Sequence, residues 1–571
     1  MNGTMNFSSD SGPLGASHES VNRAPSSVTE LLDEMRHLLE LSGENPFRIR
    51  AFEKASSALA EREDLLERAR NGTLREIPGI GQGIEEILKE FLLHSQWTAL
   101  EQLRKSIPPG LLELTQIPGL GPKKARTLIE ELGIQSIGEL EYACKENRLI
   151  RLKGFGEKIQ KKILESIALQ SSYQGFRKLS DVWQNAEQFY RDLIQEFPGL
   201  LVSETGALRR RCEVLRSLEF IVGLDEASVQ AAELRATIQS FVADFVQKYP
   251  SGLPFEIHFV QSSDYIFELA RTTSSPMHWA AIGSPEKTHE LNVTSEEEFY
   301  QNLGLNWIPP EGRETGEEVE LSRAGQLDDL LPWSGVRGVF HNHTVKSDGA
   351  ATLEQMVTRA EELGFEYIGI SDHSQSAVYA QGLRTDILEE QYREVQEVQA
   401  RHPRVRIFWG IESDILADGS LDYDTQTLQK FDFVIASIHS RFNMDRDAMT
   451  QRIVKAIRHP ATRFLGHPTG RLLLGRKGYE VDMEAIIEEA ARCGVAVELN
   501  ANPNRLDLDW RWGPQMRKYR TVTSINPDAH DLAGLEDVRY GIAMARKALL
   551  PASQVLNSKP VREVEAWLKR Q

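Results

Sequence analysis

The sequence predicts a multidomain protein with a helical N-terminal region, a mixed α/β middle region and a C-terminal β/α barrel. Three observations support this fold class. A glycine-containing turn recurs between amphipathic helices in the first third, helices and strands alternate in the middle, and short apolar runs alternate with helical patterns from residue 336 onward. Repeated β–α units predict a parallel sheet closed as a barrel, with working residues where the strands end.

Length and composition set outer limits on function. The chain has 571 residues, typical of three or four domains, and a formal net charge of −18. This charge argues against a generally basic protein that coats nucleic acid, but it permits one that grips phosphates through backbone N–H groups and a few local lysines. Three cysteines lie far apart, no apolar run approaches a membrane span, and no leader resembles a signal peptide. We therefore expect a cytoplasmic protein with no membrane partner and with nucleoid association as an open alternative.

The N-terminal region begins with residues 1–25, rich in Ser, Gly and Asn, which we expect to form a disordered tail. Helical periodicity follows, interrupted by the turns IPGIG at 77–81, IPGLG at 117–121 and LKGFG at 152–156. Each glycine pair exposes backbone N–H groups at the start of a helix, which is a cradle for phosphate. Three ordinary links between helices are the alternative interpretation. The residues predicted to bind DNA are Gly79, Gly81, Gly119, Gly121, Lys123, Lys124, Gly154, Gly156 and Lys158.

These three turns resemble helix–hairpin–helix motifs, and their order resembles the N-terminal part of family X DNA polymerases of the bacterial PolX type. The resemblance implies a lyase-like helical domain at 26–95 and a fingers-like domain with two such motifs at 96–175. Some family members carry a lyase lysine on the helix after the first hairpin, where this chain has Ile87. A Schiff-base step is therefore not expected at that position.

The middle region, 176–265, resembles the nucleotidyltransferase-like palm of the same family. Gly206, Arg209 and Arg210 fit its phosphate loop for a nucleotide. Nucleotidyl transfer needs carboxylates that hold two metal ions. The family's three aspartate positions fall on Ser217, Glu219 and Glu256, so we expect a degraded palm with doubtful polymerase activity. Mg²⁺ or Mn²⁺ would bind there if activity remained. A thumb-like segment at 266–315 and a linker at 316–335 follow, and the linker is compatible with either a flexible segment or an ordered strap.

From residue 336 the predicted strand ends carry nitrogen and oxygen donors. Histidines and carboxylates recur at seven of these ends, which scattered core or surface histidines would not do. Imidazole and carboxylate without thiolate suit zinc, manganese or iron. The candidate ligands are His341, His343, Asp348, His373, Glu412, His439, His467, Asp528 and His530.

This set resembles the PHP phosphoesterase domain (polymerase and histidinol phosphatase), a distorted β/α barrel, at 336–571. The resemblance implies three divalent metals. One would use His341, His343, Glu412 and Asp528, a second Glu412, His439 and His467, and a third Asp348, His373 and His530. The catalytic set would be His341, His343, Glu412 and Asp528, with Arg471 as a phosphate clamp or, alternatively, as a salt bridge in the barrel mouth.

Together these features predict a DNA repair protein that acts on gapped DNA or 3′ ends. Its PHP domain would hydrolyse phosphodiesters as a 3′–5′ exonuclease, with 3′-phosphatase or abasic-site endonuclease activity as variants. Three alternatives stay open: a gap-filling DNA polymerase, a phosphatase for a small ester such as histidinol phosphate, and a non-enzymatic DNA-end binder. Protein partners are unknown.

Overall fold

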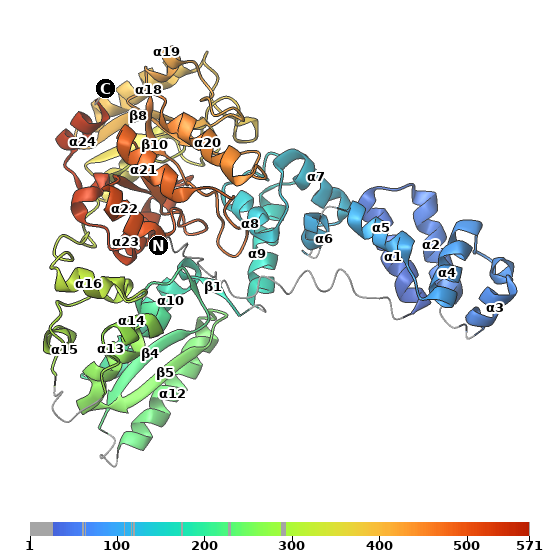
Figure 1. Ribbon diagram of the computed structural model, residues 1–571, viewed down its shortest axis with the longest axis horizontal. Helices are drawn as coiled ribbons and strands as arrows, with labels where there is room; N and C mark the ends of the chain where they lie inside the picture. Colours follow the sequence, from blue (N-terminus) through green and yellow to red (C-terminus); the bar gives the residue numbers. More distant parts are fainter. Residues whose placement is uncertain are drawn as a thin grey trace, which may run out of the picture. The chain divides into compact units, whose positions relative to one another are not determined.

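The computed structural model describes residues 27–59, 62, 64–107, 109–115, 117, 120–172, 175–225, 230–286 and 293–569 (Figure 1). The tail expected at 1–25 lies outside these residues. The chain divides into two compact units, Met1–Leu140 and Glu141–Gln571. Within the described ranges, no helix is long and apolar enough to cross a membrane.

The first unit is helical, as predicted. Its opening helix has Ser27 as N-cap, which accepts a hydrogen bond from the Glu30 N–H, and ends at Gly43 in the left-handed region with φ +75°. Leu31, Leu38 and other apolar residues at helical spacing bury one face of this helix. The helices are α1 Val28–Ser42, α2 Pro46–Leu59, α3 Leu65–Asn71, α4 Gln82–His94, α5 Thr98–Ser106, α6 Pro109–Thr115 and α7 Pro122–Leu132. Helix α8, Ile137–Lys145, runs from this unit into the next.

The second unit begins with the end of α8 and with α9, Glu157–Ser172. A three-stranded sheet follows in the order β2-β4-β5, with β2 antiparallel to β4 and β4 parallel to β5. Phe189 packs against Phe220 and Phe255 with ring centroids 4.7 and 4.9 Å apart, so an aromatic core joins helix and sheet. The elements are β1 Arg177–Lys178, α10 Leu179–Glu196, β2 Leu201–Glu204, α11 Gly206–Arg209, β3 Val214–Leu215, β4 Leu218–Leu224, α12 Ala231–Lys248 and β5 Phe255–Gln261.

Four helices connect this sheet to the barrel: α13 Tyr265–Thr273, α14 Pro276–Ala281, α15 Glu296–Asn302 and α16 Glu317–Arg323. Helix α16 lies inside the stretch that we predicted as a linker. Its Glu318 is fully buried and pairs with Nδ1 of His278 at 2.7 Å. The segment is therefore an ordered part of the fold, because a buried carboxylate holds it against α14.

The C-terminal region is the predicted barrel of parallel strands. Seven strands follow one another in the order β12-β11-β10-β9-β8-β7-β6. Backbone hydrogen bonds bring the first and last strands together, since His343 N donates to Ala529 O at 2.9 Å and Ala529 N donates to His341 O at 3.3 Å. The strands are β6 Gly338–Val339, β7 Tyr367–Ile370, β8 Arg406–Asp414, β9 Phe433–Ser437, β10 Thr462–Leu465, β11 Ala496–Asn500 and β12 Thr523–Asn526.

Helices cover the barrel, and rings fill one end of it. Phe340 packs against Tyr367, Phe408, Phe433 and Phe464, all nearly fully buried, with its centroid 4.9 Å from that of Phe464. This plug closes the barrel interior beneath the strand ends. The helices are α17 Leu353–Glu362, α18 Leu388–Arg401, α19 Thr425–Leu428, α20 Arg446–Ile457, α21 Met483–Cys493, α22 Gly513–Tyr519, α23 Val538–Lys547 and α24 Val561–Leu568.

Candidate metal centre

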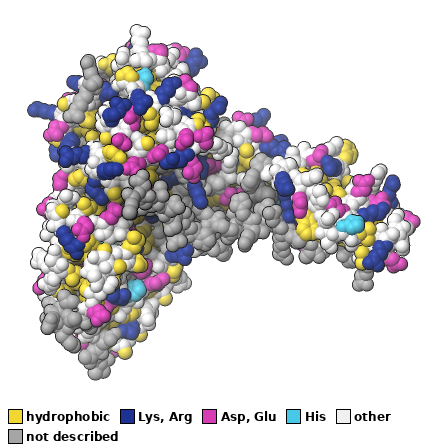
Figure 2. Space-filling view, viewed as in Figure 1, with side chains coloured by type: hydrophobic (Ala, Val, Ile, Leu, Met, Phe, Trp, Pro, Cys, Tyr) yellow, Lys and Arg dark blue, Asp and Glu magenta, His cyan; other side chains and the backbone are white. Residues whose placement is uncertain are grey.

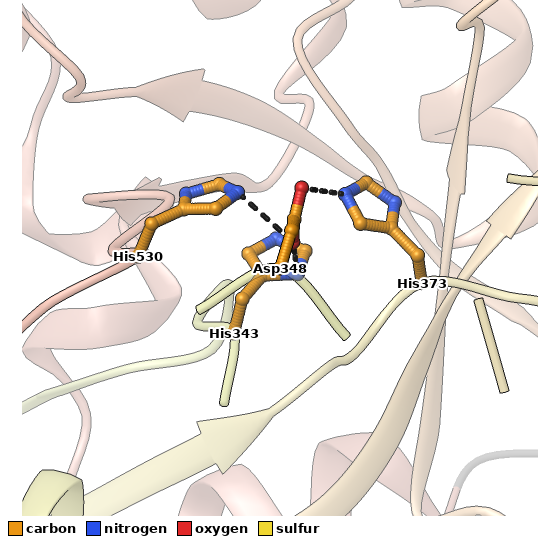
Figure 3. A group of neighbouring side chains, drawn as sticks. All are labelled: His343, Asp348, His373 and His530. Carbon is orange, nitrogen blue, oxygen red and sulfur yellow. Dashed lines mark ion pairs between the residues drawn. The ribbon is translucent and has the colours of Figure 1, made fainter. Parts of the chain in front are cut away.

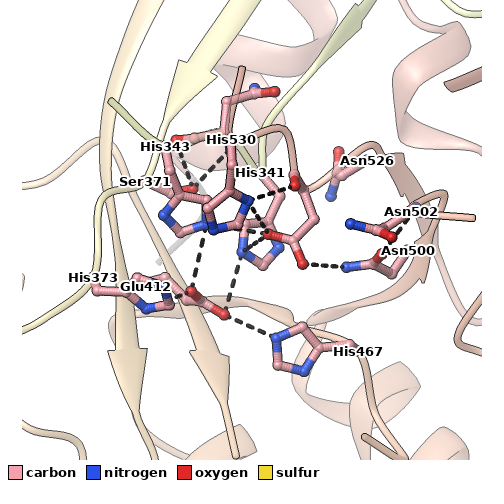
Figure 4. A network of polar contacts seen from close by, with 12 residues as sticks. His341, His343, Ser371, His373, Glu412, His467, Asn500, Asn502, Asn526 and His530 are labelled. Atoms are coloured by element: carbon pink, nitrogen blue, oxygen red, sulfur yellow. Dashed lines mark hydrogen bonds and ion pairs between the residues drawn. The ribbon is translucent and has the colours of Figure 1, made fainter. Parts of the chain in front are cut away.

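The barrel brings all nine predicted ligands into one cluster at the carboxyl ends of its strands. Figure 4 labels His341, His343, His373, Glu412, His467 and His530 among them. His341 and His343 follow β6, whose last residue is Val339, and Asp528 and His530 follow β12. Glu412 lies inside β8, and His439 and His467 come two residues after β9 and β10. Parallel strands end at one edge, so residues spread over 190 positions of sequence converge.

The donor atoms form overlapping groups in which ligand atoms lie within 4.8 Å of one another. His343, Asp348, His373 and His530 form one group, with Asp348 between His373 and His530 (Figure 3). The other barrel groups are His341, His343 and Asp528; His341, Glu412 and His467; and His373, Glu412 and His439. These groups resemble the sets implied by the family, except that His343 also joins the Asp348 group and His373 also faces Glu412.

Glu412 occupies the middle of the cluster. Its Oε1 lies 3.0 Å from His467 Nε2 and 3.2 Å from both His341 Nε2 and His439 Nε2. Its Oε2 lies 2.9 Å from His373 Nδ1. Glu412 therefore belongs to two of the donor groups.

Buried donor atoms without partners test whether a metal fits. Every one of the nine side chains is at most 7% exposed. Among the described residues, buried nitrogens of His341, His343, His373, His467 and His530 and buried oxygens of Asp348 and Glu412 have no hydrogen-bond partner. Leaving a polar atom unpaired in the interior costs on the order of 1–3 kcal/mol. So many unpaired donors in one place fit divalent metal ions, which would satisfy them.

Hydrogen bonds at the far ring nitrogens aim several imidazoles inward. His341 Nδ1 is 2.8 Å from Glu498 Oε1, and His439 Nδ1 is 2.6 Å from Asp414 Oδ1. The Nδ1–H of His530 donates to the Asp528 carbonyl at 2.9 Å. In each case Nε2 is the ring nitrogen that faces the cluster, as in carboxylate–histidine–metal arrangements.

Burial and neighbouring charges shift the pKa values of the cluster's side chains in opposite directions. Burial lowers the pKa of His341, yet Asp528, Glu498 and Glu412 together raise it well above its ordinary value. Burial and the neighbouring His530 and His373 lower the pKa of His343 to about 3. Burial raises the pKa of Glu412, but His341, His439 and His373 hold it well below its usual range. The carboxylates are thus ionised, as metal binding requires.

Several supporting residues were not among the predicted ligands. Glu498 is fully buried; besides His341, it accepts hydrogen bonds from His467 N at 2.7 Å and Asn526 Nδ2 at 3.0 Å. Asp372 accepts from Thr344, Ser347 and Gln391, which fixes the loop of Asp348. A sequence signal existed for two of them, since Asp372 adjoins His373 and Asp414 lies two residues after Glu412. Glu498 lies inside an apolar strand and offered no such signal.

Arg471 does not face the donor groups. Its guanidinium pairs with Asp509 and donates to the carbonyls of Arg505, at 3.0 Å, and Leu506. It also lies 3.7 Å from Glu213 of the middle region. The side chain holds the loop after β11, an arrangement of the kind expected for its alternative role as a salt bridge; its role as a phosphate clamp stays a prediction.

The middle region contains a second, smaller group. Glu219 and Glu256 are paired across β4 and β5, and their carboxylates lie within 4.8 Å of each other and of His258. Ser217 donates to Glu219 Oε1 at 3.4 Å and adds no charge. His258 was not predicted. Unlike the barrel cluster, this group is open to solvent, because Glu256 is exposed and Glu219 and His258 are only half-buried.

The phosphate loop beside it is occupied by protein contacts. Arg209 forms a bidentate pair with Glu296 at 3.0 and 2.6 Å. Arg210 pairs with Glu314 at 2.9 Å. Gly206 has φ +60°, and a Cβ there would approach the Glu219 carboxylate to 2.5 Å, so only glycine fits. In this structure Arg209 and Arg210 therefore form ion pairs with carboxylates of the same chain.

The glycine turns have the predicted geometry where they are described. Gly79 and Gly154 have φ of +98° and +92°, and Gly81 and Gly121 cap α4 and α7. No described atom lies within 4 Å of a Cβ built on Gly81, Gly121 or Gly156, so these helix starts are open. Lys123 and Lys124 lie in the first turn of α7 and Lys158 in that of α9, whereas Gly119 lies outside the described residues.

Charge on the surface is mixed. Figure 2 shows lysine and arginine side chains interspersed with acidic ones on the visible face. DNA contacts would therefore depend on local features such as the glycine turns.

Family models match three parts of the chain. They describe a helix-hairpin-helix domain at residues 24–96, a SAM-like helix-hairpin-helix tandem at residues 111–168 and a PHP domain at residues 340–502. A solved histidinol phosphate phosphatase from Lactococcus lactis, complexed with zinc, L-histidinol and phosphate, covers 37% of this chain and 93% of its own at 17% identity and a TM-score of 0.28.

Two relatives differ in how much of the chain they match. A probable phosphatase of Caldicellulosiruptor saccharolyticus is 31% identical over 170 residues, which are 28% of this chain and 64% of that protein. The DNA polymerase/3′-5′ exonuclease PolX of Bacillus subtilis is 34% identical over 568 residues, 95% of this chain and 99% of that protein. Because this second match runs along nearly the whole length of both proteins, the chain belongs to the PolX family of DNA polymerase/3′-5′ exonucleases.

Proposed function

We propose that this protein is a DNA repair enzyme whose barrel hydrolyses phosphodiester bonds at DNA 3′ ends with divalent metals. The observation that carries this proposal is the cluster of nine buried donors, several of them unpaired and aimed at one another. The full-length similarity to a DNA polymerase/3′-5′ exonuclease supports DNA as the substrate and the 3′ end as the point of attack.

The residues divide the work by position. His341, His343, Glu412 and Asp528 would hold one metal, and Glu412, His439 and His467 would hold a second. Asp348, His373 and His530 would hold a third. When bound, such ions activate water and stabilise the charge that develops on a phosphate. Imidazole and carboxylate donors suit zinc, manganese or iron.

The surroundings prepare these side chains for that role. Glu498 and Asp414 hold the rings of His341 and His439 in one tautomer and orientation. The aromatic plug around Phe340 keeps water out from beneath the centre. The open glycine turns before α4, α7 and α9 would bind the DNA backbone through N–H groups, with Lys123, Lys124 and Lys158 beside them.

The decisive test uses gapped duplex DNA labelled at the 5′ end of the strand upstream of the gap. Wild type with Mn²⁺ should shorten this strand one nucleotide at a time from its 3′ end. His341→Ala should not, whereas Glu219→Gln, which changes only the middle region, should retain wild-type activity. Loss of nuclease activity in Glu219→Gln but not in His341→Ala would contradict the proposal.

Three further substrates define the specificity. DNA with a 3′-phosphate, DNA with an abasic site and histidinol phosphate should be compared at equal concentration. Faster turnover of histidinol phosphate than of any DNA substrate would replace the proposed function with that of a small-molecule phosphatase.

A further inference from the structure

A turn between α8 and α9, within the second unit, reaches the metal centre of the barrel. This turn, residues 146–151, follows α8 and precedes the glycine pair that opens α9. Glu146 Oε1 lies 3.8 Å from His530 Nε2, and Arg148 Nε lies 3.9 Å from Asp348 Oδ2. Both partners belong to the donor group of His343, Asp348, His373 and His530. The proposed function does not use either residue of the turn.

The segment before this turn is fixed to the barrel. The hydroxyl of Tyr142 accepts hydrogen bonds from Arg505 Nε at 3.1 Å and Nη2 at 2.8 Å, and its ring lies 4.4 Å beneath the same guanidinium. Lys145 Nζ donates to Asn504 Oδ1 at 3.1 Å. At the other end of the turn, beyond Glu146 and Arg148, Arg151 donates to the Ser347 carbonyl at 3.1 Å. These contacts hold the turn over the centre from both sides.

Glu146 is a buried carboxylate that is only partly compensated. It is 2% exposed, and neither oxygen has a hydrogen-bond partner among the described residues, although Oε2 pairs with Arg148 Nη2 at 2.5 Å. Removing a carboxylate from water costs several kcal/mol unless strong partners replace the water. A structural role alone does not account for an oxygen left unpaired beside a histidine.

The orientation of His530 indicates what faces Glu146. Since Nδ1 of this ring is engaged by the Asp528 carbonyl, Nε2 is the atom available to a metal. Two donor atoms that each lie about 2.1 Å from one ion are separated by roughly 3–4 Å. The 3.8 Å between His530 Nε2 and Glu146 Oε1 fits this separation, directly or with one small further movement of the side chain.

Arg148 carries the charge that a phosphate needs. Its guanidinium lies 4.5 Å above the ring of Tyr379 and is only 16% exposed, with Nε unpaired among the described residues. A planar guanidinium held by an aromatic face presents its remaining N–H groups in a fixed direction. Arginine binds phosphate oxygens in a bidentate manner.

We propose that the 146–151 turn completes the phosphoesterase centre, with Glu146 binding the ion held by Asp348 and His530 and Arg148 binding the phosphate of the substrate. This inference rests on the proposed metal-dependent phosphodiesterase function. It makes the centre a joint product of the α8–α9 turn and the barrel, both in the second unit, so that the turn leading into the glycine pair of α9 also supplies part of the site.

The role of Glu146 is tested by metal titration, which does not depend on turnover. The full chain is stripped with a chelator and titrated with Mn²⁺ by calorimetry. Glu146→Gln should lose one binding step or weaken it by roughly 10- to 100-fold. Glu157→Gln removes an exposed carboxylate at the start of α9 and should titrate as wild type.

The role of Arg148 is tested with bis(4-nitrophenyl) phosphate, a small diester that needs no helix–hairpin–helix contact. At saturating Mn²⁺, Arg148→Ala should raise KM by about 10- to 100-fold, as expected for a lost charged hydrogen bond. Arg148→Lys should recover part of this loss, because it restores the charge without the bidentate fork. Arg151→Ala removes the hydrogen bond between the turn and the Ser347 carbonyl without removing a group from the centre. It therefore controls for effects that come only from a loosened turn.

The outcomes separate this inference from the function on which it rests. If wild type binds no Mn²⁺ and hydrolyses no diester, both are wrong. If wild type is active but Glu146→Gln titrates as wild type and Arg148→Ala keeps the wild-type KM, only the inference is wrong. If Arg151→Ala raises KM as much as Arg148→Ala, the turn acts by position alone and the assignment to Arg148 is overturned.

Discussion

The barrel centre and the carboxylate group of the middle region offer two ways to hold metal in one chain. The barrel centre has nine buried donors, and hydrogen bonds to Glu498, Asp414 and a backbone carbonyl orient three of its rings. The middle region has Glu219, Glu256 and His258, which face solvent, and its loop arginines pair with Glu296 and Glu314. The difference lies in preorganisation, because only the first group has its donors fixed before a ligand arrives.

The largest expected effect comes from removing the shared carboxylate of the barrel. Glu412→Gln should lose at least one bound metal and more than roughly 100-fold of the nuclease activity, since loss of an outer partner alone costs 10- to 100-fold. Glu412 lies within 3.6 Å of five imidazoles, so no neighbour can replace it. Metal content by mass spectrometry and strand shortening measure the two effects, and an unchanged metal content would remove the distinction between the two regions.

The second prediction tests whether the loop arginines of the middle region now serve the fold. Burial raises the pKa of Glu314, but Lys547 and Arg210 lower it to about 2. Glu314→Gln leaves two buried cations without their partner and should lower the free energy of unfolding by about 3 kcal/mol at pH 7. Urea unfolding measures this change, with the exposed Glu320→Gln as control.

This loss should depend on pH in one direction. A carboxyl whose pKa is lowered on folding stabilises the protein above its unfolded value, near 4.5, and stops doing so as pH falls toward 2. The difference between wild type and Glu314→Gln should therefore be constant from pH 7 to pH 5 and narrow at pH 3.5. A difference that widens on acidification would mean that Glu314 is not the ionised partner of Arg210.

A third prediction concerns a residue that supports the barrel centre from behind. Glu498→Gln weakens the hold on His341 and should lower Mn²⁺ affinity by roughly 10- to 100-fold while leaving the fold intact. Glu480→Gln, an exposed change in the same barrel, provides the charge-matched control. Equal Mn²⁺ affinity in both variants would show that the orientation of the His341 ring is not what distinguishes the barrel centre from the middle region.

The smallest effect is expected in the middle region itself. Purified protein should extend a primer no faster than Glu219→Gln, because Ser217 supplies no charge and Glu256 is exposed. A gapped primer–template with Mn²⁺ and all four nucleotides is the measurement. Templated extension that Glu219→Gln abolishes would place a second active centre in this chain.

Sequence reasoning reached the barrel and the nine side chains that cluster in it because period and residue type coincide there. Strand ends are readable from apolar runs, and histidine is rare enough to stand out at them. Contacts made by side chains distant in sequence could not be read in this way. Glu498 is hidden in an apolar strand, Arg471 is held by Asp509 across a loop, and Glu146 reaches His530 over nearly 400 residues.

Joining of the first and last strands of the barrel has a consequence for synthesis of the protein. His343 and Asp528, which face each other at 3.1 Å, are separated by 185 residues. At ribosomal speeds of about 5–20 residues per second, His343 is made roughly 10–40 s before its partner. During that interval the early histidines can meet Asp348 and Glu412 but not Asp528, so the centre can be completed only after Asp528 and His530 have been made. A ribosome that stalls between these positions would leave a chain with its helical region made and its metal centre incomplete.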